Sequence, residues 1–98
     1  MSRYFFHLRR DNETVSDVEG DEFSDREAAR ASATNAVREL VAARIKTGQV
    51  VADEYMDVSD DKGHIVLSIS FHDVVQDHLK KTAHIAPMSR RYSSSGSP

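Results

Sequence analysis

The chain has 98 residues, no cysteine, 39% hydrophobic and 30% charged residues, and a formal net charge of -3, which bounds it to about one small domain. No apolar run approaches the roughly 18 residues of a membrane span, and the first residues lack the apolar region of a secretory signal, so we expect a cytoplasmic protein. Without cysteine, a disulfide framework, a thiolate nucleophile, an iron-sulfur cluster and a cysteine-based zinc site are excluded.

The first predicted element is an aromatic-rich strand over residues 3–9. Alternation places two sets of side chains on opposite faces: Tyr4, Phe6 and Leu8 on one, and Phe5, His7 and Arg9 on the other. We expect this strand to be the best buried of the sheet. Residues 11–13 (Asp-Asn-Glu) are typical of a turn, and residues 14–18 predict a weak second strand. Gly20 then breaks the pattern, because glycine adopts positive φ readily.

A long helix is predicted next, over residues 25–46. Ser24 and Glu27 have the spacing of a capping box, in which the hydroxyl accepts a backbone N–H at the helix start and the glutamate reaches back. Gly48 marks the end. The apolar residues recur with helical spacing on one face: Ala29, Ala33, Ala36, Val37, Leu40 and Val41. The alanines let this helix approach a sheet closely, so that the aromatic rings of the first strand fill the space.

A second hairpin is predicted after a polar link. Residues 54–59 alternate between polar and apolar, residues 60–63 (Asp-Asp-Lys-Gly) are typical of a turn, and residues 64–71 alternate again. The inward set of the last strand is Ile65, Leu67, Ile69 and Phe71. A short final helix over residues 73–80, capped by Asp73, completes the pattern.

Together these elements predict an α+β fold of order ββαββ, in which one long helix packs on an antiparallel sheet of about four strands. We expect a single domain over residues 1–80 and a basic, serine-rich disordered tail over residues 81–98. The layout leaves two edge strands with unpaired N–H and C=O groups. The second strand is flanked by acidic residues and resembles a protected edge. The other edge is either solvated or open to strand addition by a partner or a second copy.

The charge distribution restricts the kind of partner. Residues 79–98 hold four of the 13 lysines and arginines and none of the 16 acidic residues, so residues 1–78 are acidic. An acidic body repels nucleic-acid phosphates. The tail alone, with basic pairs such as Arg90-Arg91, can attract an anionic partner.

Eight acidic residues between positions 11 and 27 raise the question of a calcium site, because hard cations take several carboxylates from one loop. The spacing does not fit an EF-hand loop. With Gly20 at its sixth position, Val15 occupies the first, where a ligand carboxylate belongs. We therefore expect solvated charges around a loop and a helix start.

Histidines are the other candidates for metal binding or acid–base chemistry. There are five of them: His7, His64, His72, His78 and His84. His7 and His64 both fall on predicted strands and form a joint site if those strands are neighbours, and His64 with Asp57 or Asp61 is a conceivable acid–base pair. Surface histidines without a shared role are the simpler expectation. We assign no catalytic, cofactor-binding or metal-binding residue.

Three stretches of the chain carry a family resemblance. They are residues 3–8 (Arg-Tyr-Phe-Phe-His-Leu), residues 17–29 with the Asp-Val-Glu-Gly turn, and residues 58–71 with the pattern Val-x-Asp-x-x-Gly-x-Ile-Val-Leu followed by Phe71. Together they resemble a family of short bacterial proteins known only as a domain of unknown function. The resemblance covers roughly residues 3–75 and implies the hairpin-helix-hairpin order, with no activity, cofactor or catalytic residue attached.

A looser analogy connects the chain with HicB-type antitoxins. Those proteins also run from aromatic-rich strands through an Asp-x-x-Gly turn into a helix that opens with Thr-x-x-Glu-Ala. Residues 24–28 (Ser-Asp-Arg-Glu-Ala) follow that opening, whereas Val18-Glu19 stands where the turn usually has proline. The analogy implies a class, namely small modules that act by binding another protein.

The expected function is a non-catalytic protein-interaction or regulatory module that needs no cofactor. Its partner is an unidentified protein or a second copy, bound through the open sheet face or an edge strand, and no membrane partner is expected. Two alternatives stay open. One is a nucleic-acid-binding protein that uses the basic tail, with affinity that falls steeply as salt is added. The other is a small hydrolase or metal-binding protein built around the surface histidines, although the chain has neither a nucleophile elbow nor a phosphate-binding glycine loop.

Overall fold

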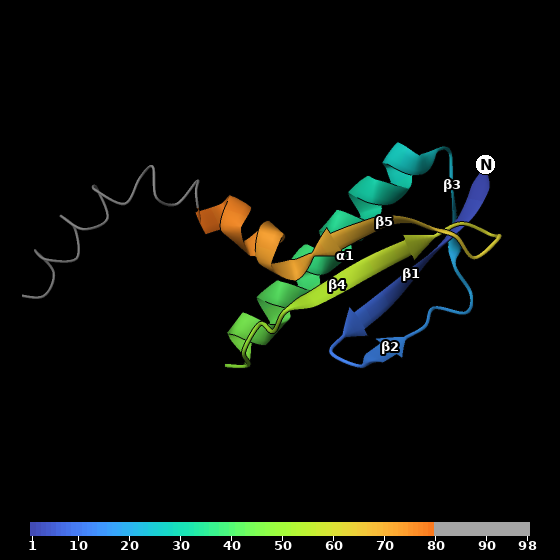
Figure 1. Cartoon of the computed structure of the whole chain (residues 1–98). Coiled ribbons are helices and arrows are strands. Elements are labelled where there is room, and N and C mark those ends of the chain that lie inside the picture. Colours follow the sequence, from blue (N-terminus) through green and yellow to red (C-terminus); the bar gives the residue numbers. More distant parts are fainter. Residues whose placement is uncertain (80–98) are drawn as a thin grey trace, which may run out of the picture.

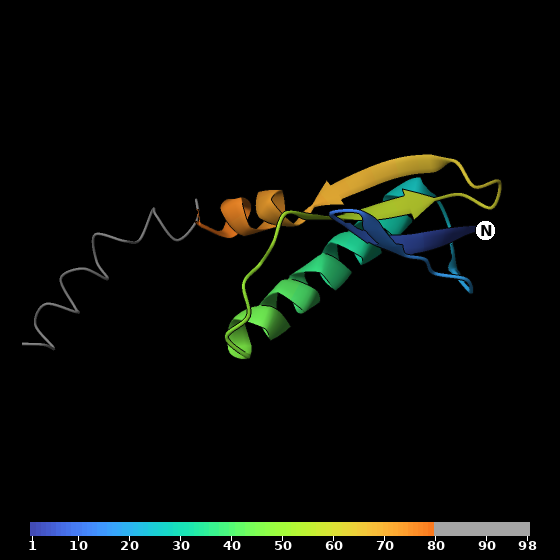
Figure 2. The same cartoon turned by 60° about the horizontal axis from the view of Figure 1, so that its bottom comes forward.

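The computed structural model describes residues 1–79 of the chain. The elements in chain order are β1 (Ser2–Arg10), β2 (Glu13–Val15), β3 (Asp21–Phe23), α1 (Arg26–Lys46), β4 (Glu54–Ser59) and β5 (Ile65–Ser70), followed by a helix over residues 71–79. They form a five-stranded antiparallel sheet with α1 against one face (Figures 1 and 2). The predicted α+β class with one long helix is confirmed. The predicted tail over 81–98 lies outside the described residues.

The strand order is β2-β1-β4-β5, with β3 paired to the first residues of β1. The two predicted hairpins are therefore present, and β1 and β4 join them at the centre of the sheet, with His7 opposite Asp57. The segment β2–β3 follows one edge of β1, since β2 pairs with its end and β3 with its start. The other edge of the sheet is β5 (Figure 1).

Between β2 and β3 the edge segment leaves the ladder. Leu8 is opposite Val15 and Tyr4 is opposite Asp21, so five residues of this segment face three of β1. The turn works because Gly20 has φ of 67°, a conformation that costs residues with a Cβ about 1–2 kcal/mol. Gly20 also lies so close to β1 that an added Cβ would be 2.7 Å from the Tyr4 carbonyl oxygen.

The core lies between α1 and the sheet. Four residues of α1 are buried, namely Ala29, Ala33, Val37 and Val41. The last three pack in one cluster with Met56, Val58, Phe71 and Val74. Two of the α1 residues are alanine, which keeps the helix close to the strands. The Phe23 ring fills the space beside it, with its centroid 5.7 Å from that of Phe6.

The best-buried strand is β4, and the expectation that β1 would hold this place was wrong. All β4 residues except Tyr55 are buried, whereas β1 residues are at most half-buried. The reason is position in the sheet. β4 lies between two long neighbours and under α1, while part of the β1 edge is covered only by short strands and a loop.

The helix ends follow local hydrogen bonding. Asp25, and not Ser24, is the N-cap, because its Oδ1 accepts the Ala28 N–H at 2.8 Å. The predicted capping box of Ser24 and Glu27 therefore does not form, because the residue three after the Asp25 N-cap is Ala28, which has no side chain that can reach back. At the other end, Gly48 donates to the Ile45 carbonyl and Gln49 to the Arg44 carbonyl, the hydrogen-bond pattern of a Schellman motif with glycine at positive φ.

A β-bulge changes the inward set of the last strand. Val58 is opposite Leu67 but Ser59 is opposite Ile65, so Val66 is an extra residue. As a result Val66 packs against the core cluster while Ile65 is 54% exposed, which corrects the prediction that Ile65 faces inward. A bulge re-aims side chains in this way because it breaks the period of two.

The final helix begins earlier than expected. It starts at Phe71, and the Ser70 hydroxyl, rather than Asp73, caps it by accepting the Asp73 N–H at 3.2 Å. Phe71 is fully buried and Val74 nearly so, which docks this short helix on the core. Leu79, in contrast, is 59% exposed.

One buried ion pair connects α1 with β4. Glu54 is only 2% exposed because it lies on the same face of β4 as Met56 and Val58. Arg44 donates from Nη1 to its Oε2 at 2.5 Å, and the guanidinium also lies over the Phe71 ring. A buried carboxylate needs such a partner, since desolvation of an unpaired charge is costly.

Substituting Gly20 tests the close approach to β1. Gly20→Ala introduces left-handed strain of about 1–2 kcal/mol and a clash with β1 of about 1–3 kcal/mol. Gly63→Ala is the matched control, because Gly63 also has positive φ but no atom within 4 Å of an added Cβ. Urea unfolding should show a larger loss of unfolding free energy for Gly20→Ala than for Gly63→Ala. Equal losses would mean that the contact between Gly20 and β1 is absent.

Candidate functional site

The face of the sheet opposite α1 carries a cluster of polar side chains from three strands. Asp57 of β4 is its centre, with 7% of its surface exposed. Arg9 of β1 donates to it twice, from Nε at 2.7 Å and from Nη2 at 3.2 Å, and the Ser68 hydroxyl of β5 donates at 2.7 Å. The strand register brings these residues together, since side chains of period two on neighbouring strands share a face.

The charges of this cluster stabilise each other. Burial raises the pKa of Asp57, but the hydrogen bonds from Arg9 and Ser68 and the positive charge of Arg9 outweigh it, so that the pKa is below its ordinary value of 3.8. The hydrogen bond with Asp57 likewise raises the pKa of Arg9. The Arg9 guanidinium also lies 4.4 Å from the centroid of the Tyr55 ring. The cluster therefore has its hydrogen bonds satisfied internally, as a structural network does.

A second carboxylate, Asp17, closes the gap between β2 and β3. Its Oδ1 accepts the N–H groups of Glu19 and Gly20, and its Oδ2 accepts the Phe6 N–H, all at 3.1 Å. Burial raises the pKa of Asp17, but these three backbone donors outweigh it and lower the pKa below 3.8. The Phe6 N–H thus finds a carboxylate where the β ladder is interrupted.

His7 and Ser59 form the pair most like a catalytic one. The His7 Nε2 is 2.9 Å from the Ser59 Oγ, but its Nδ1 accepts the backbone N–H of Asp17 at 3.1 Å. In a neutral ring Nε2 must then carry the proton and donate to Ser59, whereas a general base for a serine nucleophile needs a free lone pair at that position. Ser59 is also only 3% exposed. The arrangement fixes the loop on the sheet and does not activate the serine.

The other histidines lie apart from this pair. His64 precedes β5 and is largely exposed, with its Nδ1 3.7 Å from Asp60, so the joint site with His7 does not form. The salt bridges of residues 1–79 pair His64 with Asp60 and not with Asp61, and Asp57 binds Arg9 and Ser68, so neither predicted acid–base pair forms. His72 contacts the Val51 carbonyl at 3.4 Å, and His84 lies outside the described residues.

Metal-binding geometry can be judged over residues 1–79. In that part of the chain no three histidine or acidic side chains converge as a metal site would require. The acidic stretch between positions 11 and 27 is spread over strands, loop and helix start, and the Asp17 carboxylate is occupied by backbone donors. In the same part of the chain, no helix has the length and apolar character to cross a membrane.

The outer edge of β5 has a different character from the rest of the surface. Among residues 1–79 no strand pairs with that edge. Its sequence from Ile65 to Phe71 contains no charged residue and no proline. Beside it lies a polar groove of about 230 Å³ between α1, β5 and the final helix. Its lining residues include Arg30, Thr34, Ser68, Ser70, Asp73 and Asp77.

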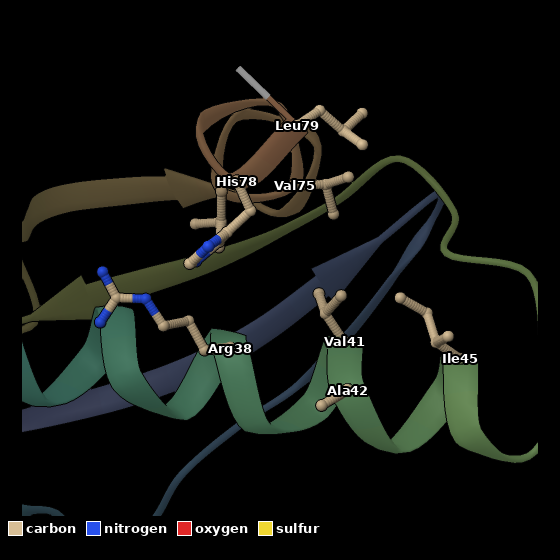
Figure 3. Close-up of a pocket in the computed structure, with 8 residues that line it drawn as sticks. Arg38, Val41, Ala42, Ile45, Val75, His78 and Leu79 are labelled. Carbon is tan, nitrogen blue, oxygen red and sulfur yellow. The ribbon is translucent and has the colours of Figure 1, made fainter. Parts of the chain in front are cut away.

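A second groove, of about 390 Å³, lies between α1 and the final helix. Its walls are apolar and are lined by Val41 and Ile45 from α1 and by Val75 and Leu79 from the final helix (Figure 3). Arg38 and His78 lie at one end of it (Figure 3). Sequence reasoning missed both grooves, because they depend on where the final helix docks.

Comparison with known proteins adds a family. The model of a domain of unknown function, DUF6894, matches residues 3–72. The chain belongs to this family. The resemblance seen in the sequence is thereby confirmed, and the DUF6894 match includes α1 and every strand except the first residue of β1. No curated protein and no solved structure matches the chain.

The role of Asp17 can be tested by its pH dependence. The folded pKa is below the ordinary 3.8, so this carboxylate contributes stability that is fully present above about pH 5 and is lost as pH falls through the folded pKa. Asp17→Asn should cost about 2 kcal/mol at neutral pH, with a difference from the parent that shrinks in acid. Urea unfolding of the variant and the parent at a series of pH values measures this difference in unfolding free energy.

The matched control is Asp21→Asn. Asp21 is exposed in β3 and accepts none of these backbone bonds, so its substitution should change the free energy of unfolding by less than about 0.5 kcal/mol. A constant difference between Asp17→Asn and the parent at all pH values would contradict the assigned role of the Asp17 carboxylate.

The His7 tautomer provides a separate test. Nitrogen-15 NMR of the imidazole should show the proton on Nε2 while the ring is neutral, because Nδ1 accepts the Asp17 N–H. A fluorophosphonate probe of serine hydrolases should leave Ser59 unmodified. A proton on Nδ1 together with a labelled Ser59 would restore the hydrolase alternative.

Proposed function

We propose that this chain is a non-catalytic protein-binding module that takes an extended segment of its partner along the outer edge of β5. The observation that carries the proposal is the contrast between the two edges of the sheet. One edge ends in two strands of three residues joined by a loop, and the other presents an uncharged six-residue strand with no neighbour among the described residues.

The β1 edge is poorly suited to strand addition. Its covering strands β2 and β3 have three residues each, and the Asp17 loop between them takes up the Phe6 N–H. Short strands, bulges and acidic side chains are the usual means by which proteins protect an edge from unwanted pairing. The sequence prediction of a protected second strand agrees with this geometry.

The β5 edge lacks most of these protections. It has six residues, and its one bulge lies at its start, so residues 67–70 pair regularly with β4. Its uncharged sequence stands in a chain in which 30% of residues are charged. Strand addition uses main-chain hydrogen bonds for affinity and alternate side chains for specificity, and this edge offers both.

The open sheet face is less suited to binding a partner than the β5 edge is. Its polar groups already bind each other, since Arg9 and Ser68 bind Asp57 and His7 binds Ser59. A partner on this face would have to replace contacts that are satisfied, at a cost for every group left unpaired. The free backbone groups of β5 carry no such cost.

Two further expectations from the sequence stay predictions. Nucleic-acid binding through the basic segment concerns residues outside the described part of the chain. The other is the cytoplasmic location.

A photo-crosslinking pair tests the proposal directly. Ile65 in β5 and Val15 in β2 are both 54% exposed, so a photoreactive residue at either position meets solvent to the same extent. Irradiation in an extract of the native cell should give protein adducts from position 65 and far fewer from position 15. Adducts of equal yield at the two positions, or none at position 65, would contradict the assignment of β5.

A further inference from the structure

The helix beside the β5 edge presents positive charge toward it. Arg26, Arg30, Thr34 and Arg38 follow one another at four-residue intervals, which places them in one stripe along α1. Arg30 and Thr34 line the polar groove together with β5 residues 68–70. The stripe is one position removed from the buried Ala29, Ala33 and Val37. Arg30 and Thr34 therefore flank the core on the β5 side, whereas Arg38, farther along, lines the apolar groove beside the final helix.

These arginines have little internal neutralisation. Arg30 is 3.6 Å from Glu27, in an exposed pair. Within residues 1–79, no salt bridge involves Arg26 or Arg38. Arg30 lines the polar groove and Arg26 lies one helical turn before it on the stripe, so their charge is available to a bound segment on the α1 side of the groove.

The spacing of the stripe fits an added strand. Four residues of helix advance about 6 Å, and two residues of strand advance about 6.7 Å. Side chains that point from an added strand toward α1 therefore recur at nearly the interval of the stripe. Acidic residues at two successive positions of this kind would meet Arg30 and, one helical turn earlier, Arg26.

The end of the groove beside Ser70 has the opposite charge. Asp73 and Asp77 of the final helix line it there. Antiparallel pairing, the slightly more stable arrangement, places the N-terminal end of the added segment next to these carboxylates. That end is suited to a lysine, an arginine or a free amine.

We infer that the segment bound along β5 is acidic at the alternate positions that face α1 and basic at its N-terminal end. The inference rests on the proposed function and names the chemistry of the partner. It disfavours two copies joined through β5 alone, because an antiparallel β5–β5 contact presents an uncharged strand and brings the two arginine stripes along one seam.

The experiment is an NMR titration of the nitrogen-15-labelled full chain with two synthetic peptides of equal length. One begins with lysine and continues with alternating threonine and glutamate, and the other has lysine in place of each glutamate. The acidic peptide should shift the β5 amide signals at lower concentration than the basic peptide does, and added salt should weaken its binding. Arg30→Glu should reduce the preference about 1.5- to 5-fold for each exposed ion pair lost.

Arg10→Glu is the matched control, because Arg10 is exposed at the end of β1 and away from the groove. It should keep the preference for the acidic peptide. If the two peptides shift the β5 amides equally, or if Arg30→Glu leaves the preference unchanged, the acidic specificity is wrong while strand addition stands. If neither peptide shifts the β5 amides, the proposed function and this inference both fall.

Discussion

The Asp17 carboxylate accepts hydrogen bonds from three backbone N–H groups, and this set of contacts finishes one edge of the sheet. It turns the β2–β3 segment back toward β1, brings Gly20 against the Tyr4 carbonyl, and places the Asp17 N–H on the His7 ring. A buried backbone donor must find a partner. Where the ladder is interrupted, the Asp17 side chain accepts the Phe6 N–H that a carbonyl of a neighbouring strand would otherwise accept. The two edges of the sheet therefore differ: among the described residues, one ends in the three-residue strands β2 and β3 and the other in the six-residue β5.

The packing of α1 shapes the groove beside that edge. Ala29 and Ala33 are fully buried, which brings the helix close under the strands and leaves the Arg30 side of the helix beside β5. A larger residue at position 33 would move the helix away and widen the groove. The core that stabilises the domain and the groove that we propose for binding therefore depend on the same small side chains.

Much of the fold could be predicted from the sequence because its signals are periodic. Alternation in β1 and β5 and the helical spacing of Ala29, Ala33, Val37 and Val41 report burial directly. The errors lie where one residue changes the period of the alternation, or where the place of an element in the folded chain decides its burial. Because of the bulge, Val66 and not Ile65 packs against the core. Asp25, and not Ser24, caps α1. Strand order, and with it the burial of β4, depends on long-range pairing that a local pattern does not contain.

The candidate site was harder to predict for the same reason. The conceivable acid–base partners of His64 were near it in sequence, whereas His7 binds Asp17 and Ser59, which are distant. Sequence could have pointed to β5, because Ile65 to Phe71 is a long uncharged run in a highly charged chain. Its flanking arginines become visible only when α1 is placed beside the edge.

Amide hydrogen exchange tests the central claim most directly. The labelled chain would be followed by NMR in buffer and in an extract of the native cell, and the exchange rates of β5 compared with those of β2. The account predicts that the β5 amides that do not pair with β4 exchange rapidly in buffer and become protected in the extract, while β2 is unchanged. Protection confined to β2 or to the face around Asp57, with β5 still in rapid exchange, would contradict it.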